Sequence, residues 1–260
     1  MLAALPLLFF SFYRTRGAPS APTYAQDKRQ PDLPIVDYEK EISKPKDPAR
    51  KQKGERFKGQ GNFDRRKAIA QLPDGFEVAT TITHWWIGLS ALPVDRSDVV
   101  IRGTITGREA YLSDDRTGIY SEFLVQVAET FKDSTGTIAA GTPLTVNRSG
   151  GRVHFASGKT QEYRVYGQDM PRPGREYVLF LRRTADGDLL ILTGYELAYG
   201  YVHPLDGEET QDPRSDLPFA KYRGKEATSF LQELRDAATS SNGAFLRLGS
   251  GLRFWDSLLT

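Results

Sequence analysis

Histidine is the side chain best suited to proton transfer and metal binding near neutral pH, and this chain has three: His84, His154 and His203. A zinc site on a helix needs two histidines four residues apart, and structural zinc sites usually include cysteines. These histidines lie far apart, and the chain has no cysteine, so the pattern predicts no metal site. A hydrolase stays open as an alternative, because folding can bring together Ser, His and Asp residues that are distant in sequence.

The segment from Gly151 to Thr160 comes nearest to a phosphate-binding loop. Such a loop has four residues between two glycines, then Lys and Ser or Thr, and leads into a helix. Here six residues separate Gly151 from Gly158, and the residues after Thr160 alternate as in a strand. We therefore expect a turn that carries Lys159, and no nucleotide or other cofactor.

Three carboxylates near the middle of the chain have the residue types needed for acid–base catalysis: Asp114, Asp115 and Glu122. Aspartates in a turn more often bond to their own backbone, so we expect Asp114 and Asp115 to cap a turn and Glu122 to lie on the exposed face of a strand. The acidic stretch from Asp206 to Asp216 lacks the spacing of a calcium loop and predicts a solvated loop. No residue is assigned as catalytic.

A group of basic and aromatic residues is the candidate ligand-binding site: Arg148, Arg152, Lys159, Tyr163 and Tyr166. On a small barrel, such residues bind single-stranded nucleic acid through phosphate contacts and base stacking. That is a second alternative function.

The charge distribution argues against nucleic acid. Residues 40–67 contain 11 Lys or Arg and 4 Asp or Glu, a net charge of +7, whereas the whole chain has +2. The rest of the chain is therefore at −5, and the basic character belongs to one segment. We expect no nucleic-acid partner.

The first 75 residues have two distinct compositions. Leu2 to Phe10 is apolar apart from one proline, which is too short to span a bilayer but has the length of a signal-peptide core. We expect residues 1–25 to act as an export signal. Residues 26–75 are basic and poor in aliphatic residues, which is typical of a disordered linker, with a helical turn at 38–42 and a short helix at 65–72.

From residue 76 to residue 240 the pattern is that of a β domain with one helix. In the strand that starts at Asp98, Val99, Ile101 and Ile105 alternate with polar residues, and Gly103 marks a bend. Phe123, Val125 and Val127 share the face of a long second strand. Short strands joined by turns predict a mainly all-β fold, an antiparallel barrel or sandwich. The bent first strand favours a Greek-key barrel of the OB type.

Further elements follow from local patterns. Ser149-Gly-Gly151 and Ala185-Asp-Gly187 each predict a hairpin, and Tyr177 to Leu181 is apolar on both faces, as in a covered central strand. Apolar residues at helical spacing predict an amphipathic helix over 225–238 that docks on the barrel. Residues 241–260 form a tail.

Several stretches resemble, as a set, a group of uncharacterised exported bacterial proteins: Ser97-Asp-Val-Val, Ala110-Tyr-Leu-Ser-Asp-Asp, Tyr120-Ser-Glu-Phe, Arg148-Ser-Gly-Gly-Arg-Val, Tyr177-Val-Leu-Phe-Leu and Leu192-Thr-Gly-Tyr-Glu-Leu. The resemblance covers residues 89–207 and implies no activity. More remotely, the layout resembles the OB barrel of netrin modules and tissue inhibitors of metalloproteinases. Those inhibitors depend on cysteines that this chain lacks, so protease inhibition is not implied.

Together these patterns predict a non-catalytic binding or structural module. We expect it to be exported, as a periplasmic, secreted or envelope-anchored protein, with a partner in the envelope or outside the cell. Contact with a membrane is expected only through the N-terminal segment, if that segment is not cleaved.

Overall fold

The computed structural model describes residues 33–44, 48–58, 68–72, 76–207 and 217–251. The compact unit that contains them runs from Leu33 to Thr260. The segment expected to direct export, residues 1–25, lies outside the described residues. Within the described part, no helix is both long and apolar enough to cross a membrane.

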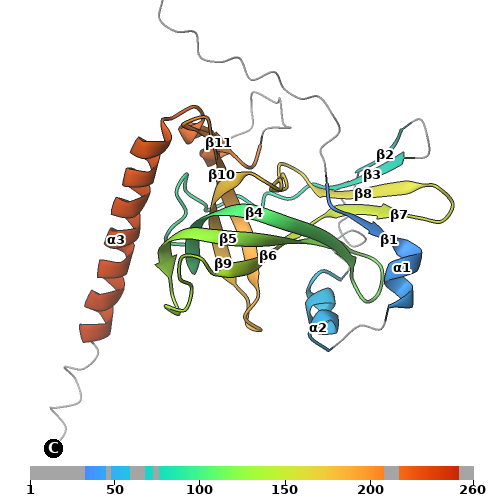
Figure 1. Cartoon of the computed structure of the whole chain (residues 1–260), viewed down its shortest axis with the longest axis horizontal. Coiled ribbons are helices and arrows are strands. Elements are labelled where there is room, and N and C mark those ends of the chain that lie inside the picture. Colours follow the sequence, from blue (N-terminus) through green and yellow to red (C-terminus); the bar gives the residue numbers. More distant parts are fainter. Residues whose placement is uncertain (1–32, 45–47, 59–67, 73–75, 208–216, 252–260) are drawn as a thin grey trace, which may run out of the picture. The chain divides into compact units, whose positions relative to one another are not determined.

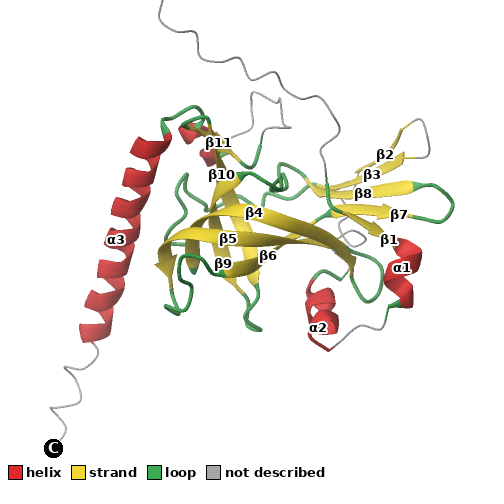
Figure 2. Ribbon diagram, in the orientation of Figure 1, coloured by secondary structure: helices red, strands yellow, loops and turns green. Residues whose placement is uncertain are grey.

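Five strands pair in a closed circuit that forms a barrel, and their positions are labelled in Figures 1 and 2. They are β4 (Val99–Leu112), β5 (Ile119–Asp133), β6 (Pro143–Ser149), β9 (Glu176–Arg183) and β10 (Leu189–Ala198). The pairing runs β9–β4–β5–β6–β10, and β10 pairs back with β9. Only the β6–β10 pairing in this circuit is parallel. The prediction of a mainly all-β, antiparallel barrel is confirmed.

The barrel interior is filled by alternate residues from all five strands. Val99, Ile101 and Ile105 belong to this core, as do Phe123 and Val125, which confirms the alternation predicted for β4 and β5.

Gly103 marks a bend in β4, as expected. The register of the β4–β5 pair shifts at this glycine. A Cβ at position 103 would lie 2.6 Å from the carbonyl oxygen of Gln126, so only glycine lets the two strands approach this closely.

Strand β9 is covered on both faces, as its sequence predicts. Leu179 and Leu181 point into the barrel, while Val178 and Phe180 join a second core on the outside. That outer core is covered by the 3-10 helix η2 (Pro218–Tyr222) and by the helix α3 (Ala227–Gly251). The predicted hairpin at 185–187 joins β9 to β10.

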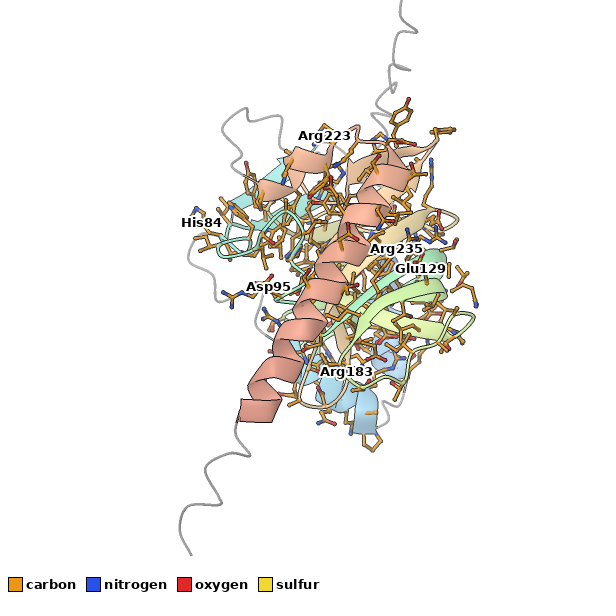
Figure 3. All side chains as sticks on the ribbon, turned by 90° about the vertical axis from the view of Figure 1, so that its left-hand side faces the viewer. His84, Asp95, Glu129, Arg183, Arg223 and Arg235 are labelled. Carbon is orange, nitrogen blue, oxygen red and sulfur yellow. The ribbon has the colours of Figure 1, made fainter. Side chains whose placement is uncertain are left out.

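The C-terminal helix is confirmed and is longer than expected. Phe230, Leu231 and Leu234 carry its docking face, and an ion pair between Arg235 and Glu129 of β5 flanks that face, with a shortest distance of 3.0 Å (Figure 3). The helix continues to Gly251, into the region expected to be a tail.

A second, five-stranded sheet forms among the described residues, in the order β1–β7–β8–β3–β2. Its strands are β1 (Ile35–Asp37), β2 (Ala68–Leu72), β3 (Phe76–Thr81), β7 (Gly151–His154) and β8 (Thr160–Val165). β11 (Tyr201–Pro204) instead adds to β10 of the barrel.

The hairpin predicted at Ser149-Gly-Gly151 is wrong. β6 pairs with β5 and β10, whereas β7 pairs with β8 and β1. Gly150 and Gly151 have φ values of 107° and 142°, a region that favours glycine. The two glycines therefore carry the chain out of the barrel and into the second sheet.

The prediction of a disordered linker over 26–75 is wrong for its described parts. β1 pairs with β7, α1 (Tyr38–Ser43) confirms the expected helical turn, and α2 (Pro48–Arg56) leads to the buried Phe57. The helix expected at 65–72 is a strand over 68–72, paired with β3. The folded unit thus starts well before residue 76. Contacts with distant strands, rather than local apolar content, order these segments.

Candidate functional site

Arg148, the first residue of the predicted binding group, is a buried structural residue. Its side chain is 1% exposed and lies 2.8 Å from a carboxylate oxygen of Asp206. It also donates a hydrogen bond of 2.7 Å to the carbonyl oxygen of Asp169. A guanidinium paired in this way ties β6 to the loops before β9 and after β11, and is not available to a ligand.

Asp206 itself is not part of a solvated loop. It is buried and accepts a second bond of 3.0 Å from the backbone N–H of Asp169. Burial raises the pKa of Asp206, and the Arg148 guanidinium acts in the opposite direction. The remainder of the acidic stretch, 208–216, lies outside the described residues.

The other predicted binding residues do not form one surface. Arg152 pairs with the buried Glu162 at 2.8 Å, and Glu162 lies opposite it on β8. Because neighbours on a strand face opposite sides, Tyr163 is on the other face, where it packs against a small core. Lys159 is exposed in the β7–β8 turn, and Tyr166 lies beyond the end of β8. The structure separates the group that the sequence suggested.

The three histidines lie on different elements. His84 is exposed in the segment before β4 (Figure 3), and His154 is exposed on β7, 3.2 Å from the hydroxyl of Thr160. His203 is on β11. Among the described residues, no cluster of three or more His, Asp or Glu side chains could hold a metal ion.

The carboxylates considered for acid–base chemistry have structural contacts. Asp115 accepts bonds from Ser113 and from the backbone and hydroxyl of Thr117, so the predicted turn cap is confirmed at this residue. Glu122 is not on an open face: its side chain is 16% exposed and lies 2.7 Å from the ammonium of Lys53.

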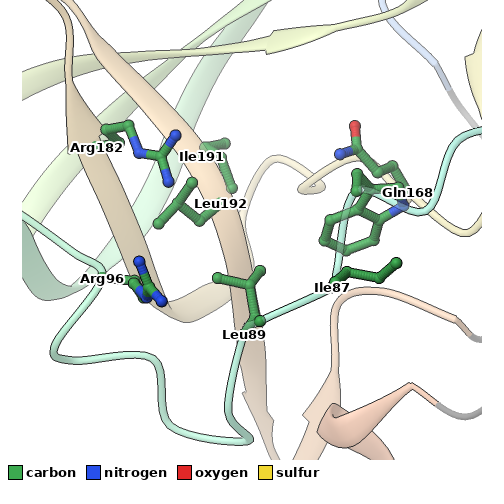
Figure 4. Close-up of a pocket in the computed structure, with 9 residues that line it drawn as sticks. Ile87, Leu89, Arg96, Gln168, Arg182, Ile191 and Leu192 are labelled. Carbon is green, nitrogen blue, oxygen red and sulfur yellow. The ribbon is translucent and has the colours of Figure 1, made fainter.

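A surface pocket of about 240 Å³ opens beside strands β9 and β10 (Figure 4). The segment before β4, the loop after β8 and the two strands line it: Trp85, Ile87, Gly88, Leu89, Arg96, Gln168, Arg182, Ile191 and Leu192.

Two arginines lie on one side of this pocket, with Gln168 on the opposite side (Figure 4). Among the described residues, no carboxylate is within ion-pair distance of Arg182. Arg96 has only a marginal partner, Asp95 at 3.9 Å, and both of these side chains are well exposed. Neither guanidinium is held by a strong internal partner. Each is therefore free to bind an anion by donating two parallel hydrogen bonds to it.

The walls between the arginines and Gln168 are apolar and held in place. The β9–β10 register shifts around Leu192, and bulges of this kind redirect side chains at functional sites. Trp85 donates a hydrogen bond of 2.9 Å from Nε1 to the carbonyl oxygen of Tyr166 and stacks on Phe219 at 5.8 Å. The pocket is therefore largely preformed.

The sequence analysis missed this pocket. Trp85 and Trp86 both pack against the outer core that covers β9. The available signal was Arg182, which continues the outward row of Val178 and Phe180 on β9 but is exposed. A charged residue at the end of an apolar row indicates the point at which that face of the strand is no longer covered by other elements and becomes exposed.

Comparisons of this chain with protein-family models, with curated proteins and with solved structures found no match.

Proposed function

We propose that this protein is a non-catalytic, exported binding module whose ligand binds in the pocket beside β9 and β10. The observation that carries the proposal is the pair formed by Arg96 and Arg182, which line a pocket of mixed polar and apolar character and have no strong internal partner. A preformed pocket in which polar groups converge beside apolar side chains is the usual form of a ligand site.

The chemistry of the pocket selects the class of ligand. The arginines favour a carboxylate or phosphate, and Leu89 and Leu192 favour a compact apolar group next to it. The volume of about 240 Å³ is below the usual range for drug-sized ligands. A small amphiphilic anion, or the anionic end of a larger molecule, suits this site.

Two further features support the proposal. The five-stranded circuit, with an antiparallel first pair and a bulged first strand, supports the assignment of an OB-type Greek-key barrel, an architecture used widely for binding. The apolar run from Leu2 to Phe10 supports export.

Titration with octanoate, followed by tryptophan fluorescence, tests the site, because Trp85 lines the pocket. We expect saturable binding by the wild type. Arg182→Ala and Arg96→Ala should each weaken it about tenfold, since a charge-assisted hydrogen bond contributes roughly 1.5–3 kcal/mol.

Lys159→Ala is the matched control. It removes the same charge from an exposed turn in the group that the sequence suggested. We expect it to leave the affinity unchanged. An equal loss in the lysine and arginine variants would mean that net charge, and not the pocket, holds the anion.

The histidines distinguish the binding module from the hydrolase alternative. For a binding module, we expect that replacing His84, His154 or His203 with alanine abolishes no turnover, because these residues lie on three separate elements. The purified protein is screened with esterase, glycosidase, phosphatase and peptidase substrates, and each replacement is then compared. Turnover that one replacement abolishes, in a variant that is still folded, would favour the hydrolase.

A further inference from the structure

Residues 48–58, which comprise α2 and the two residues after it, pack against one end of the barrel. Their one aromatic side chain, Phe57, makes the apolar contact. Phe57 is 2% exposed and stacks on Tyr120 of β5, with ring centroids 4.5 Å apart and planes at 11°. Tyr111 of β4 pairs with Tyr120 and completes this small cluster. The helix itself, Pro48–Arg56, contains no large apolar residue.

Charged side chains make the other contacts of this segment. The Arg50 guanidinium lies over the ring of Tyr111, 3.7 Å from its centre, and the remaining contacts are ion pairs. The Lys53 ammonium lies 2.7 Å from Glu122 and 3.4 Å from Asp188. Arg56 pairs with Asp188 at 2.9 Å and also with Asp186. These side chains are 16–25% exposed, so ions from solution can reach them. A basic segment thus docks on an acidic, aromatic end of the barrel.

The fit is close at the backbone. A Cβ at Gly118 would lie 2.0 Å from the carbonyl oxygen of Phe57, and one at Gly54 would lie 3.3 Å from the backbone nitrogen of Asp114. The surface is therefore shaped to the segment, and Gly118 is a position where a methyl group alone would prevent docking.

Two observations indicate that the docked state is conditional. A nine-residue helix without a large apolar residue does not persist by itself in water, so α2 depends on the barrel for its structure. Docking also buries the hydroxyl of Tyr120, which has no hydrogen-bond partner among the described residues. A buried polar group without a partner favours the open state, in which water can reach it.

We propose that the barrel end formed by Tyr111, Tyr120, Glu122, Asp186 and Asp188 is a docking surface for a basic segment with an aromatic residue. Residues 48–58 occupy it in cis as a reversible latch. The same segment, residues 48–58, of a second copy of this chain binds there when the latch is released.

Hydrogen exchange of the full chain tests the latch. Raising the salt from about 20 mM to about 500 mM shortens the screening length several-fold. The amides of 50–57 should then exchange at least roughly tenfold faster. The amides of 230–238 in α3 are the internal control, because an apolar face docks that helix, and they should change by less than about twofold. Protection of 50–57 that is independent of salt would overturn the latch.

Binding of a separate peptide tests the surface. Arg56→Glu should release residues 48–58 by reversing a charge, and Gly118→Ala should release them through a steric clash with the backbone of Phe57. A labelled synthetic peptide of residues 48–58 should bind Arg56→Glu at low salt at least roughly tenfold more tightly than it binds the wild type, whose site is occupied.

The control chain is Arg56→Glu combined with Asp188→Lys, which removes the acidic partner and should not bind the peptide. A peptide with Phe57→Ala should also fail to bind. Equal binding to all chains would overturn the docking surface, as would no binding to Arg56→Glu. If Arg56→Glu does not fold, Lys53→Glu replaces it, since Lys53 makes the other basic contacts.

Discussion

Replacing Leu179 with aspartate is expected to unfold the protein. Leu179 is fully buried in the middle of β9, among the apolar side chains of the barrel interior. Burying an unpaired carboxylate costs several kcal/mol, while a whole domain is usually stable by only about 5–15 kcal/mol. Circular dichroism with thermal and urea melts measures the effect.

The matched control is Leu124→Asp. Leu124 lies on β5, another strand of the same barrel, but is 43% exposed, so the same substitution should shift the midpoint only slightly. A soluble Leu179→Asp variant with an unchanged melting temperature would show that β9 is not the covered strand described here.

The second large effect is expected at the buried ion pair. Arg148→Ala leaves the carboxylate of Asp206 buried without its cationic partner, although the backbone N–H of Asp169 still donates to it at 3.0 Å. Removing one partner of such a pair costs roughly 3–5 kcal/mol. Urea unfolding should show this loss as a lower midpoint with an unchanged slope.

Arg235→Ala is the comparison. It breaks the pair with Glu129 on the surface of the molecule, where the Arg235 side chain is 44% exposed, and such pairs contribute at most about 1 kcal/mol. Equal losses in the two variants would contradict a structural role for Arg148 and would return it to the list of candidate ligand residues.

The barrel could be predicted from sequence because its signals are local. Alternation in β4 and β5, the two-sided apolar run of β9 and the helical spacing near Phe230 each follow from neighbouring residues. The sequence predicts a turn at Gly150 but not the direction in which the chain leaves that turn. A hairpin and a passage between two sheets can have the same glycines.

The ordered N-terminal part could not be predicted because its partners are distant. Lys53 and Arg56 are held by residues of the β9–β10 turn and of β5, and Phe57 stacks on Tyr120. Low aliphatic content predicts disorder when a segment stands alone, and here the barrel supplies the surface. The pocket could not be predicted for the same reason, because its two arginines come from segments that are distant in sequence.

A titration of the ¹⁵N-labelled protein with octanoate, followed by amide and indole shifts in two-dimensional NMR spectra, tests the binding site most directly. The structure predicts saturable shifts at the indole N–H of Trp85 and at the backbone amides of Gln168, Arg182 and Leu192, and their loss in Arg182→Ala. Shifts confined to the β7–β8 turn around Lys159, or shifts that persist unchanged in Arg182→Ala, would contradict a binding site in this pocket.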